Sequence, residues 1–188
     1  MTQVRRELVP VVLAVLLVVA ARAVEPAGSG SVFPDPDFSQ ALTLWETTPA
    51  TEHVRVVATP QQPFSQALSI DSRKSARPVQ LVSKPFVIEP LVRYSVSSTM
   101  RRIGQYQRPP QIHLAWLDRT GVIIGRGFVH RACPVEMEWT AYQGHVLAPA
   151  DATHARIVIP ISSGLTVQLA QLLVQANPGS TTRLDVDL

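Results

Sequence analysis

From residue 52 to residue 175 the sequence consists of short runs in which apolar and polar residues alternate, separated by proline, glycine, asparagine or aspartate. In the clearest run, the even positions from Val92 to Met100 are mostly apolar, whereas the odd positions from Arg93 to Thr99 are polar. Successive side chains of a strand point to opposite faces, so this period predicts half-buried strands. We predict eight or nine strands, in the ranges 52–58, 66–70, 81–88, 92–100, 111–117, 122–128, 139–147, 154–161 and 165–175.

An all-β sandwich or barrel is the fold class that this spacing of strands and turns predicts. The 16 prolines favour many short elements, because proline is costly inside helices and central strands. Pro85 interrupts the run 81–88 and is expected at an edge or bulge. The segment 168–175 has the composition of a helix, but the turn at Gly164 and its β-branched neighbours favour a strand.

The N-terminus has the features of an export signal. Arg5 and Arg6 precede the uncharged apolar run Leu8–Ala21, and Ala21-Arg22-Ala23 is a small-x-small cleavage site. The alternative is an uncleaved anchor helix, in which the Arg22 side chain snorkels and the apolar stretch extends over residues 8–24. Both readings place the remainder of the chain in the periplasm or outside the cell.

Four parts are therefore expected along the chain: a signal peptide or hydrophobic anchor helix at 1–23, a linker at 24–32, the β-sandwich at 33–176 and a tail at 177–188. Cys133 is the only cysteine, so the domain has no internal disulfide. We expect Cys133 to be a small buried residue rather than a reactive thiol.

Five short motifs, in order, resemble the galactose-binding-like jelly roll of carbohydrate-binding modules. They are Asp35-Pro36-Asp37-Phe38 followed by Trp45, Tyr94-Ser95-Val96-Ser97, Leu114–Gly121, Trp139-Thr140-Ala141-Tyr142, and Ala148–Arg156. The resemblance implies a jelly-roll β-sandwich with a sugar-binding role. Where the family often has carboxylates near a structural calcium, this chain has Ser39 and the uncharged run 168–171. We therefore expect no metal and no cofactor, although Asp35 and Asp37 could still supply oxygen ligands.

Sugar binding requires exposed aromatic faces and planar hydrogen-bonding side chains, and only 6% of the residues are aromatic. Trp45, Trp116 and Tyr94 fall on expected inner faces and are assigned to the core. Trp139 and Tyr142 fit either environment. Tyr106, in the loop 102–110, is the best candidate for an exposed aromatic residue.

An outward polar patch completes the candidate ligand-binding set. Its members come from strands that we expect to be neighbours, and with Tyr106 they form the set Arg93, Tyr106, Gln111, His113, His154 and Arg156. Such a patch would suit hydroxyls, carboxylates or phosphates. An ordinary solvated sheet face is the alternative explanation.

The sequence contains no catalytic motif and its five histidines are scattered, so we expect no enzyme activity. The basic residues, with a net charge of +3, form no dense stripe of the kind that binds nucleic acid. The preferred function is an exported, non-catalytic binding module that contacts a glycan at the cell envelope. The alternative is a membrane-anchored accessory subunit that uses the sandwich to contact a larger membrane protein complex.

Overall fold

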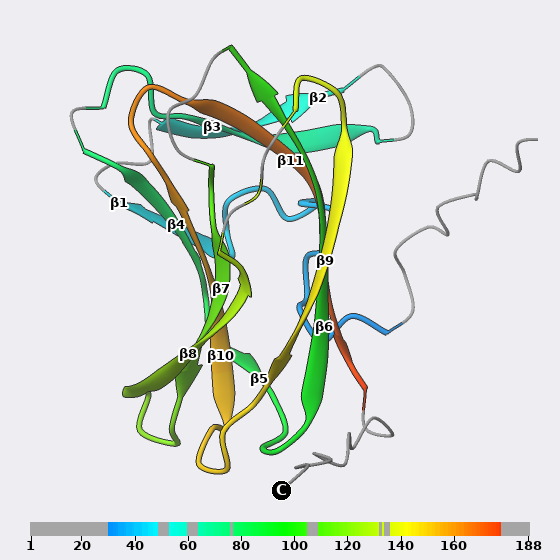
Figure 1. Ribbon diagram of the computed structural model, residues 1–188, viewed down its shortest axis with the longest axis vertical. Helices are drawn as coiled ribbons and strands as arrows, with labels where there is room; N and C mark the ends of the chain where they lie inside the picture. The colour runs from blue at the N-terminus through cyan, green and yellow to red at the C-terminus, as the bar shows by residue number, and fades with distance from the viewer. Residues whose placement is uncertain are drawn as a thin grey trace, which may run out of the picture.

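The computed structural model describes residues 30–48, 53–59, 64–75, 77–104, 109–131, 133 and 136–177, which form two antiparallel sheets packed face to face (Figure 1). The predicted N-terminal helix, the linker before residue 30, the loop with Tyr106 and the tail after Asn177 lie outside these ranges. Within the ranges, no helix reaches the length and hydrophobicity that a membrane span requires.

The sheet around β10, called here the β10 sheet, contains β1 (Trp45–Thr48), β4 (Val79–Ser83), β10 (His154–Ile161), β7 (Ile112–Leu117) and β8 (Ile123–His130) in that order, with β5 (Phe86–Val87) also paired to β10. The opposite sheet, called the β11 sheet, contains β2 (Val54–Ala58), β3 (Gln66–Asp71), β11 (Thr166–Ala176), β6 (Arg93–Ile103) and β9 (Thr140–Leu147). Most neighbours within a sheet are distant in sequence. This order confirms the predicted jelly-roll sandwich.

The strand boundaries differ from the prediction in two places. The single run expected at 81–88 is divided into β4 and β5, with Lys84 and Pro85 between them. Proline has no N–H to donate, so the ladder is interrupted there. β1 was missed because its four residues, WETT, are too few to show an alternating pattern. The described residues therefore contain eleven strands rather than eight or nine.

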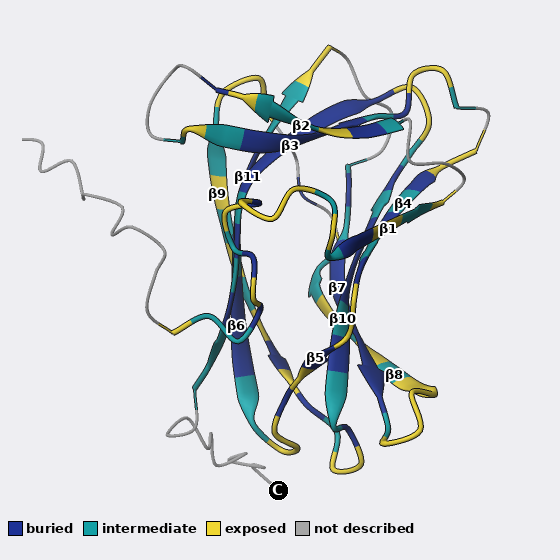
Figure 2. Cartoon of the chain, turned by 180° about the vertical axis from the view of Figure 1, so that it is seen from behind, coloured by how far each residue is buried: buried dark blue, intermediate teal, exposed yellow. Residues whose placement is uncertain are grey.

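The core lies between the sheets and is built from the apolar positions that the alternation identified (Figure 2). Trp116 of β7 is only 2% exposed, and its ring centroid lies 6.4 Å from that of the buried Tyr94 on β6. Trp45 is also buried and packs edge-on to Phe33, with ring centroids 5.3 Å apart. The assignment of Trp45, Trp116 and Tyr94 to the core is confirmed.

Cys133 is a free cysteine in the core, as expected from its isolation in the sequence. Burial raises the pKa of its thiol to about 12, because the thiolate would lose its hydration. A thiol that stays protonated at neutral pH is a poor nucleophile. Cys133 is therefore a packing residue.

Candidate functional site

The sequence-predicted site residues are divided between the two sheets. His113 lies on β7 and His154 and Arg156 lie on β10, which are adjacent strands of the β10 sheet. Arg93 begins β6 in the other sheet, so the prediction that it shares their patch is wrong. The alternation revealed which side of a strand is polar, but not which sheet the strand joins. Gln111 lies half-buried just before β7, and Tyr106 is outside the described residues.

His113 points away from the core but is buried nonetheless. Its ring centroid lies 5.2 Å from that of Phe128 on the neighbouring β8, and its Nδ1 atom has no hydrogen-bond partner among the described residues. Burial, helped by the nearby Arg126, lowers its pKa to about 4. His113 is therefore neutral at physiological pH and is not part of an exposed donor-rich patch.

Acidification is expected to destabilise the fold through His113. Because its folded pKa of about 4 lies below the usual 6.5, the unfolded chain binds this proton first as the pH falls. The contribution of neutral His113 to the free energy of unfolding is fully present above pH ~6.5. It decreases toward pH ~4 and is smaller by about 2 kcal/mol near pH 4.5. Urea titrations at pH 7 and 4.5 should show a smaller acid loss for His113→Gln than for the unaltered protein. Equal losses in the two proteins would contradict this assignment.

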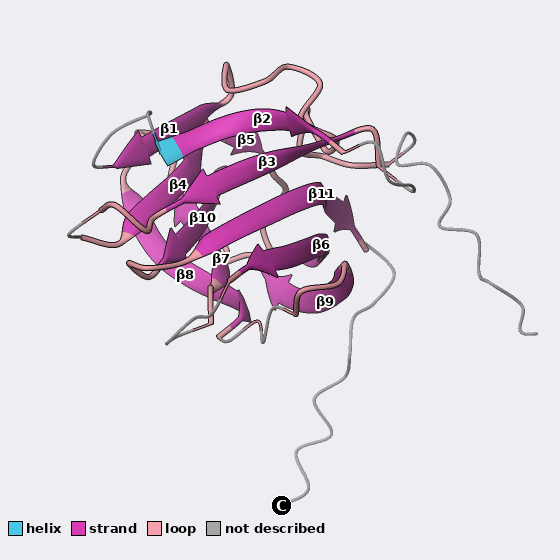
Figure 3. Ribbon diagram, turned by 90° about the horizontal axis from the view of Figure 1, so that it is seen from above, coloured by secondary structure: helices cyan, strands magenta, loops and turns pink. Residues whose placement is uncertain are grey.

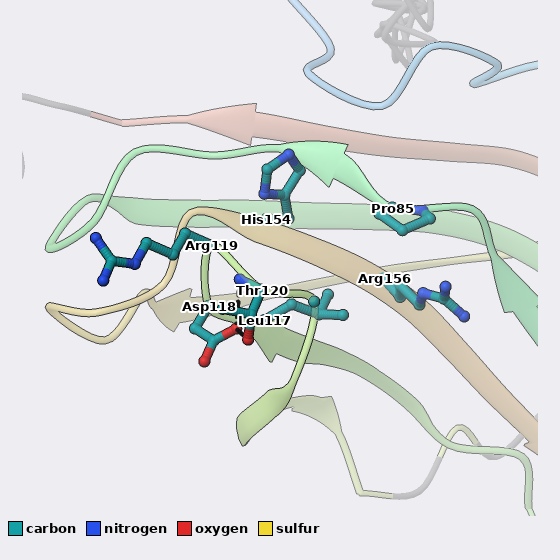
Figure 4. Close-up of a pocket in the computed structure, with 8 residues that line it drawn as sticks. Pro85, Leu117, Asp118, Arg119, Thr120, His154 and Arg156 are labelled. Atoms are coloured by element: carbon teal, nitrogen blue, oxygen red, sulfur yellow. Dashed lines mark hydrogen bonds between the residues drawn. The ribbon is translucent and has the colours of Figure 1, made fainter.

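His154 and Arg156 line a small pocket on the outer face of the β10 sheet, together with Pro85, Leu117 and the β7–β8 turn at 118–121 (Figure 4). Its volume is about 260 Å³, below the ~300–1,000 Å³ typical of small-molecule sites. In the close-up, the Arg119 and Arg156 side chains extend in opposite directions from the pocket. The pocket thus brings two of the predicted residues together without making their charges converge.

Several polar groups around this pocket are already engaged, although the buried Arg156 Nε atom has no partner among the described residues. The Arg156 Nη1 atom lies 3.4 Å from Glu46 Oε2. The Asp118 Oδ1 atom accepts hydrogen bonds from the N–H groups of Thr120 and Val122 and from the Thr120 hydroxyl, which stabilise the turn and lower the Asp118 pKa. We therefore assign a structural role to these groups, and the other sheet carries the stronger candidate site.

The outer face of the β11 sheet carries many polar side chains among apolar ones such as Leu173 and Leu147. Figure 3 shows its strands β2, β3, β11, β6 and β9 side by side. We call this set the polar face. It consists of Arg55, Ser69, Arg93, Ser95, Ser97, Thr99, Arg101, Gln143, His145, Gln168, Gln171 and Gln175. Partners across neighbouring strands lie on the same side of a sheet, so the register places these residues in rows.

Two rows illustrate the arrangement. Arg101, Gln168, Ser69 and Arg55 pair in succession across β6, β11, β3 and β2. A second row runs through His145, Ser95 and Gln175 across β9, β6 and β11. Ser69, Ser95 and Gln168 are buried, so the accessible polar groups of these rows are those of Arg55, Arg101, His145 and Gln175. The rigid sheet holds them in fixed positions.

Arg101 is the most firmly held of the polar-face cations. Its Nε atom donates to Gln168 Oε1 at 2.7 Å, and its guanidinium carbon lies 4.6 Å from the centroid of the Trp139 ring. Phe64 contacts that ring edge-on, with centroids 5.5 Å apart. A hydrogen bond and a cation–π contact already restrict this guanidinium, so it loses little further conformational entropy when a ligand binds. The Arg101–Gln168–Trp139 cluster is our candidate functional site.

Sequence reasoning missed this cluster, although one signal pointed to it. The polar odd positions of 92–100 continue to Arg101, so this arginine shares a face with Arg93. Gln168 and Gln171 differ in parity and should lie on opposite faces of a regular strand. A register irregularity between Leu169 and Gln171 brings both to the polar face.

Asp35 and Asp37 are the carboxylates of the opening motif, and Asp37 Oδ1 accepts a hydrogen bond from the Ser39 N–H. Asp35 is buried, and its Oδ1 atom accepts hydrogen bonds from the Ser39 hydroxyl at 3.1 Å and the Gln40 N–H at 3.0 Å, whereas Oδ2 has no described partner. In the described part of the chain, no three His, Cys, Asp or Glu residues gather into a ligand set. One carboxylate that is already hydrogen-bonded falls short of the oxygen ligands that calcium takes.

No protein-family model and no curated protein matches the sequence. Solved structures with a similar fold include the module TmCBM61 in complex with β-1,4-galactotriose, which is 13% identical with a TM-score of 0.55 over 79% of this chain and 100% of that one. The CBM22-1 xylan-binding domain of Paenibacillus barcinonensis Xyn10C is also 13% identical, with a TM-score of 0.55 over 78% and 91% of the two chains.

The enzymatically active domain of tailspike protein 4 from bacteriophage CBA120 is a third similar structure. It is 15% identical, with a TM-score of 0.63 over 79% of this chain and only 21% of that chain. This chain thus spans about a fifth of the tailspike domain and most or all of the two binding modules. At these identities the similarity establishes the fold, which is that of carbohydrate-binding modules.

Proposed function

We propose that the protein is an exported, non-catalytic glycan-binding module and that it binds through the polar face. The observation that carries the proposal is the Arg101–Gln168–Trp139 cluster, held on a sheet face that is rich in amide, hydroxyl and guanidinium groups. Sugar hydroxyls both donate and accept, so amide side chains such as Gln143 and Gln171 suit them. The fold shared with modules described as bound to galactotriose or as xylan-binding supports the same role.

A catalytic role has little support on this face. Hydrolysis of a glycosidic bond ordinarily uses two carboxyl groups on either side of the bond. Among the described strand residues that point outward from the β11 sheet, Asp71 is the carboxylate, and it is paired with Arg73 at 2.7 Å. We therefore propose that the domain holds a glycan without cleaving it.

Substitution of Arg101 tests the proposal. We expect Arg101→Ala to weaken glycan binding about tenfold to a hundredfold, because it removes hydrogen bonds from a charged donor. The measurement is polysaccharide pull-down and glycan-array binding of the full chain in mild detergent. Arg156→Ala, on the opposite sheet, is the matched control and should bind normally. Absence of binding to every glycan would refute the proposal, as would loss of binding in the control alone.

A second candidate, an accessory subunit of a membrane complex, is favoured by one observation. The edge strand β8 exposes Ile123, Ile124 and Phe128, and exposed apolar edges are typical contact surfaces. Mass spectrometry of the mature N-terminus separates the candidates. A chain that begins at Val24 supports a released module at the cell envelope, whereas an intact N-terminus supports a membrane-anchored subunit.

A further inference from the structure

The polar face carries an excess of positive charge. Three arginines, Arg55, Arg93 and Arg101, point outward from β2 and β6. Within the described residues, none of these three side chains forms a salt bridge. Arginine remains charged at every physiological pH. Within the described part of the chain, the face therefore presents three cations that no salt bridge compensates.

Asp71, the outward-facing carboxylate among the described strand residues of this sheet, does not cancel them. Asp71 accepts hydrogen bonds from Arg73 Nε at 2.9 Å and Nη2 at 2.7 Å, and its Oδ1 atom also accepts from the Thr166 hydroxyl at 3.0 Å. These bonds hold its pKa well below the usual range, with the Arg73 hydrogen bond as the largest cause. Asp71 is neutralised by its own neighbour and is not available to the three arginines.

The guanidinium of Arg101 retains donors that an anion can use. Its Nε atom is used by Gln168, and in the described residues no acceptor is bonded to Nη1 or Nη2. The two terminal nitrogens of a guanidinium form a fork that matches a carboxylate in bidentate geometry. A neutral hydroxyl could use only one of these donors at a time and would leave the charge uncompensated.

The spacing of the arginines indicates a polymer. Arg101 and Arg55 are three strands apart in one row, or about 14 Å. Arg93 lies eight residues before Arg101 on β6, about 27 Å along the strand. A single small anion could not contact all three. A polymer that carries charges at intervals could contact all three arginines.

We infer that the polar face binds an acidic polysaccharide, whose carboxylate or sulfate groups pair with Arg101, Arg55 and Arg93. Its hydroxyls contact the partly exposed Ser97, Gln171 and Gln175 on the same face. The inference rests on the proposed glycan-binding function. It adds the class of ligand, an acidic polymer, which differs from the galactotriose and xylan named for the similar modules.

Paired polymers that differ only in charge test the inference. We expect the full chain to bind polygalacturonate at least about tenfold more tightly than its fully methyl-esterified form, or dextran sulfate more tightly than dextran, and the pair that responds identifies carboxylate or sulfate. Because these pairings are partly exposed, affinity should fall as salt rises. Arg101→Lys keeps the charge but loses the fork, and should weaken carboxylate binding, whereas Arg156→Lys should not.

The outcomes separate the inference from the proposed function. Equal or tighter binding of the neutral polymers would overturn the inference and leave the glycan-binding function standing. Binding of poly-glutamate as tight as that of both acidic polysaccharides would also overturn it, since the face would then recognise charge alone. Failure to bind any polymer, charged or neutral, would remove both.

Discussion

Replacing Trp116 with alanine is expected to lower the free energy of unfolding by about 3–5 kcal/mol. The indole is buried between the sheets and packs near Tyr94, so truncation removes apolar contacts and leaves a cavity. A typical domain is stable by only about 5–15 kcal/mol, so this loss is a large fraction of the free energy of unfolding. The measurement is urea unfolding monitored by far-ultraviolet circular dichroism, since removal of the indole also changes the fluorescence signal.

Trp116→Phe serves as the control for this effect. It retains an aromatic ring in the same space and should lose substantially less stability than the alanine variant, because a smaller cavity remains. If Trp116→Ala lost less than about 1 kcal/mol, the indole would not be the centre of the core. The placement of the Trp116 side chain between the two sheets would then be in error.

The same buried residues show why the fold was predictable. A strand sandwiched between a core and solvent must alternate, and Tyr94 and Trp116 fall on the apolar side of such runs. The sequence also marked the break at Pro85, where the ladder is interrupted. It did not predict that β7 is buried on both faces, because Ala115 and Leu117 are covered by neighbours from other strands.

The candidate site was less predictable, because it depends on pairings between distant segments. Arg93 and His154 both follow the alternating pattern, yet they lie in different sheets, and only the strand order decides this. Gln168 and Arg101 are 67 residues apart in sequence and are brought together by the register of β11 against β6. The bulge at Ala170 then shifts the parity of the residues that follow.

Gly144→Ala is expected to destabilise the protein by about 1–3 kcal/mol, the range for overpacking a close contact. A Cβ atom at this position of β9 would lie 2.6 Å from the Val129 carbonyl oxygen and 2.9 Å from its Cγ1 atom, both on β8. A backbone oxygen cannot rotate away, so the two strands must move apart. β8 and β9 belong to different sheets, and the glycine allows their close approach.

Two glycines of the neighbouring strand β8, Gly125 and Gly127, provide a graded comparison for Gly144 on β9. A Cβ at Gly127 would meet side-chain atoms of Trp116 and Val146 at 3.0–3.1 Å, so Gly127→Ala should cost less, because side chains can shift. At Gly125 the nearest atom is 3.6 Å away, an ordinary contact, and alanine there should be neutral or slightly stabilising by restricting the unfolded chain. Urea unfolding of the three variants should rank Gly144, Gly127 and Gly125 from largest loss to smallest. A Gly144→Ala protein as stable as Gly125→Ala would show that β8 and β9 do not approach as closely as the structure has them.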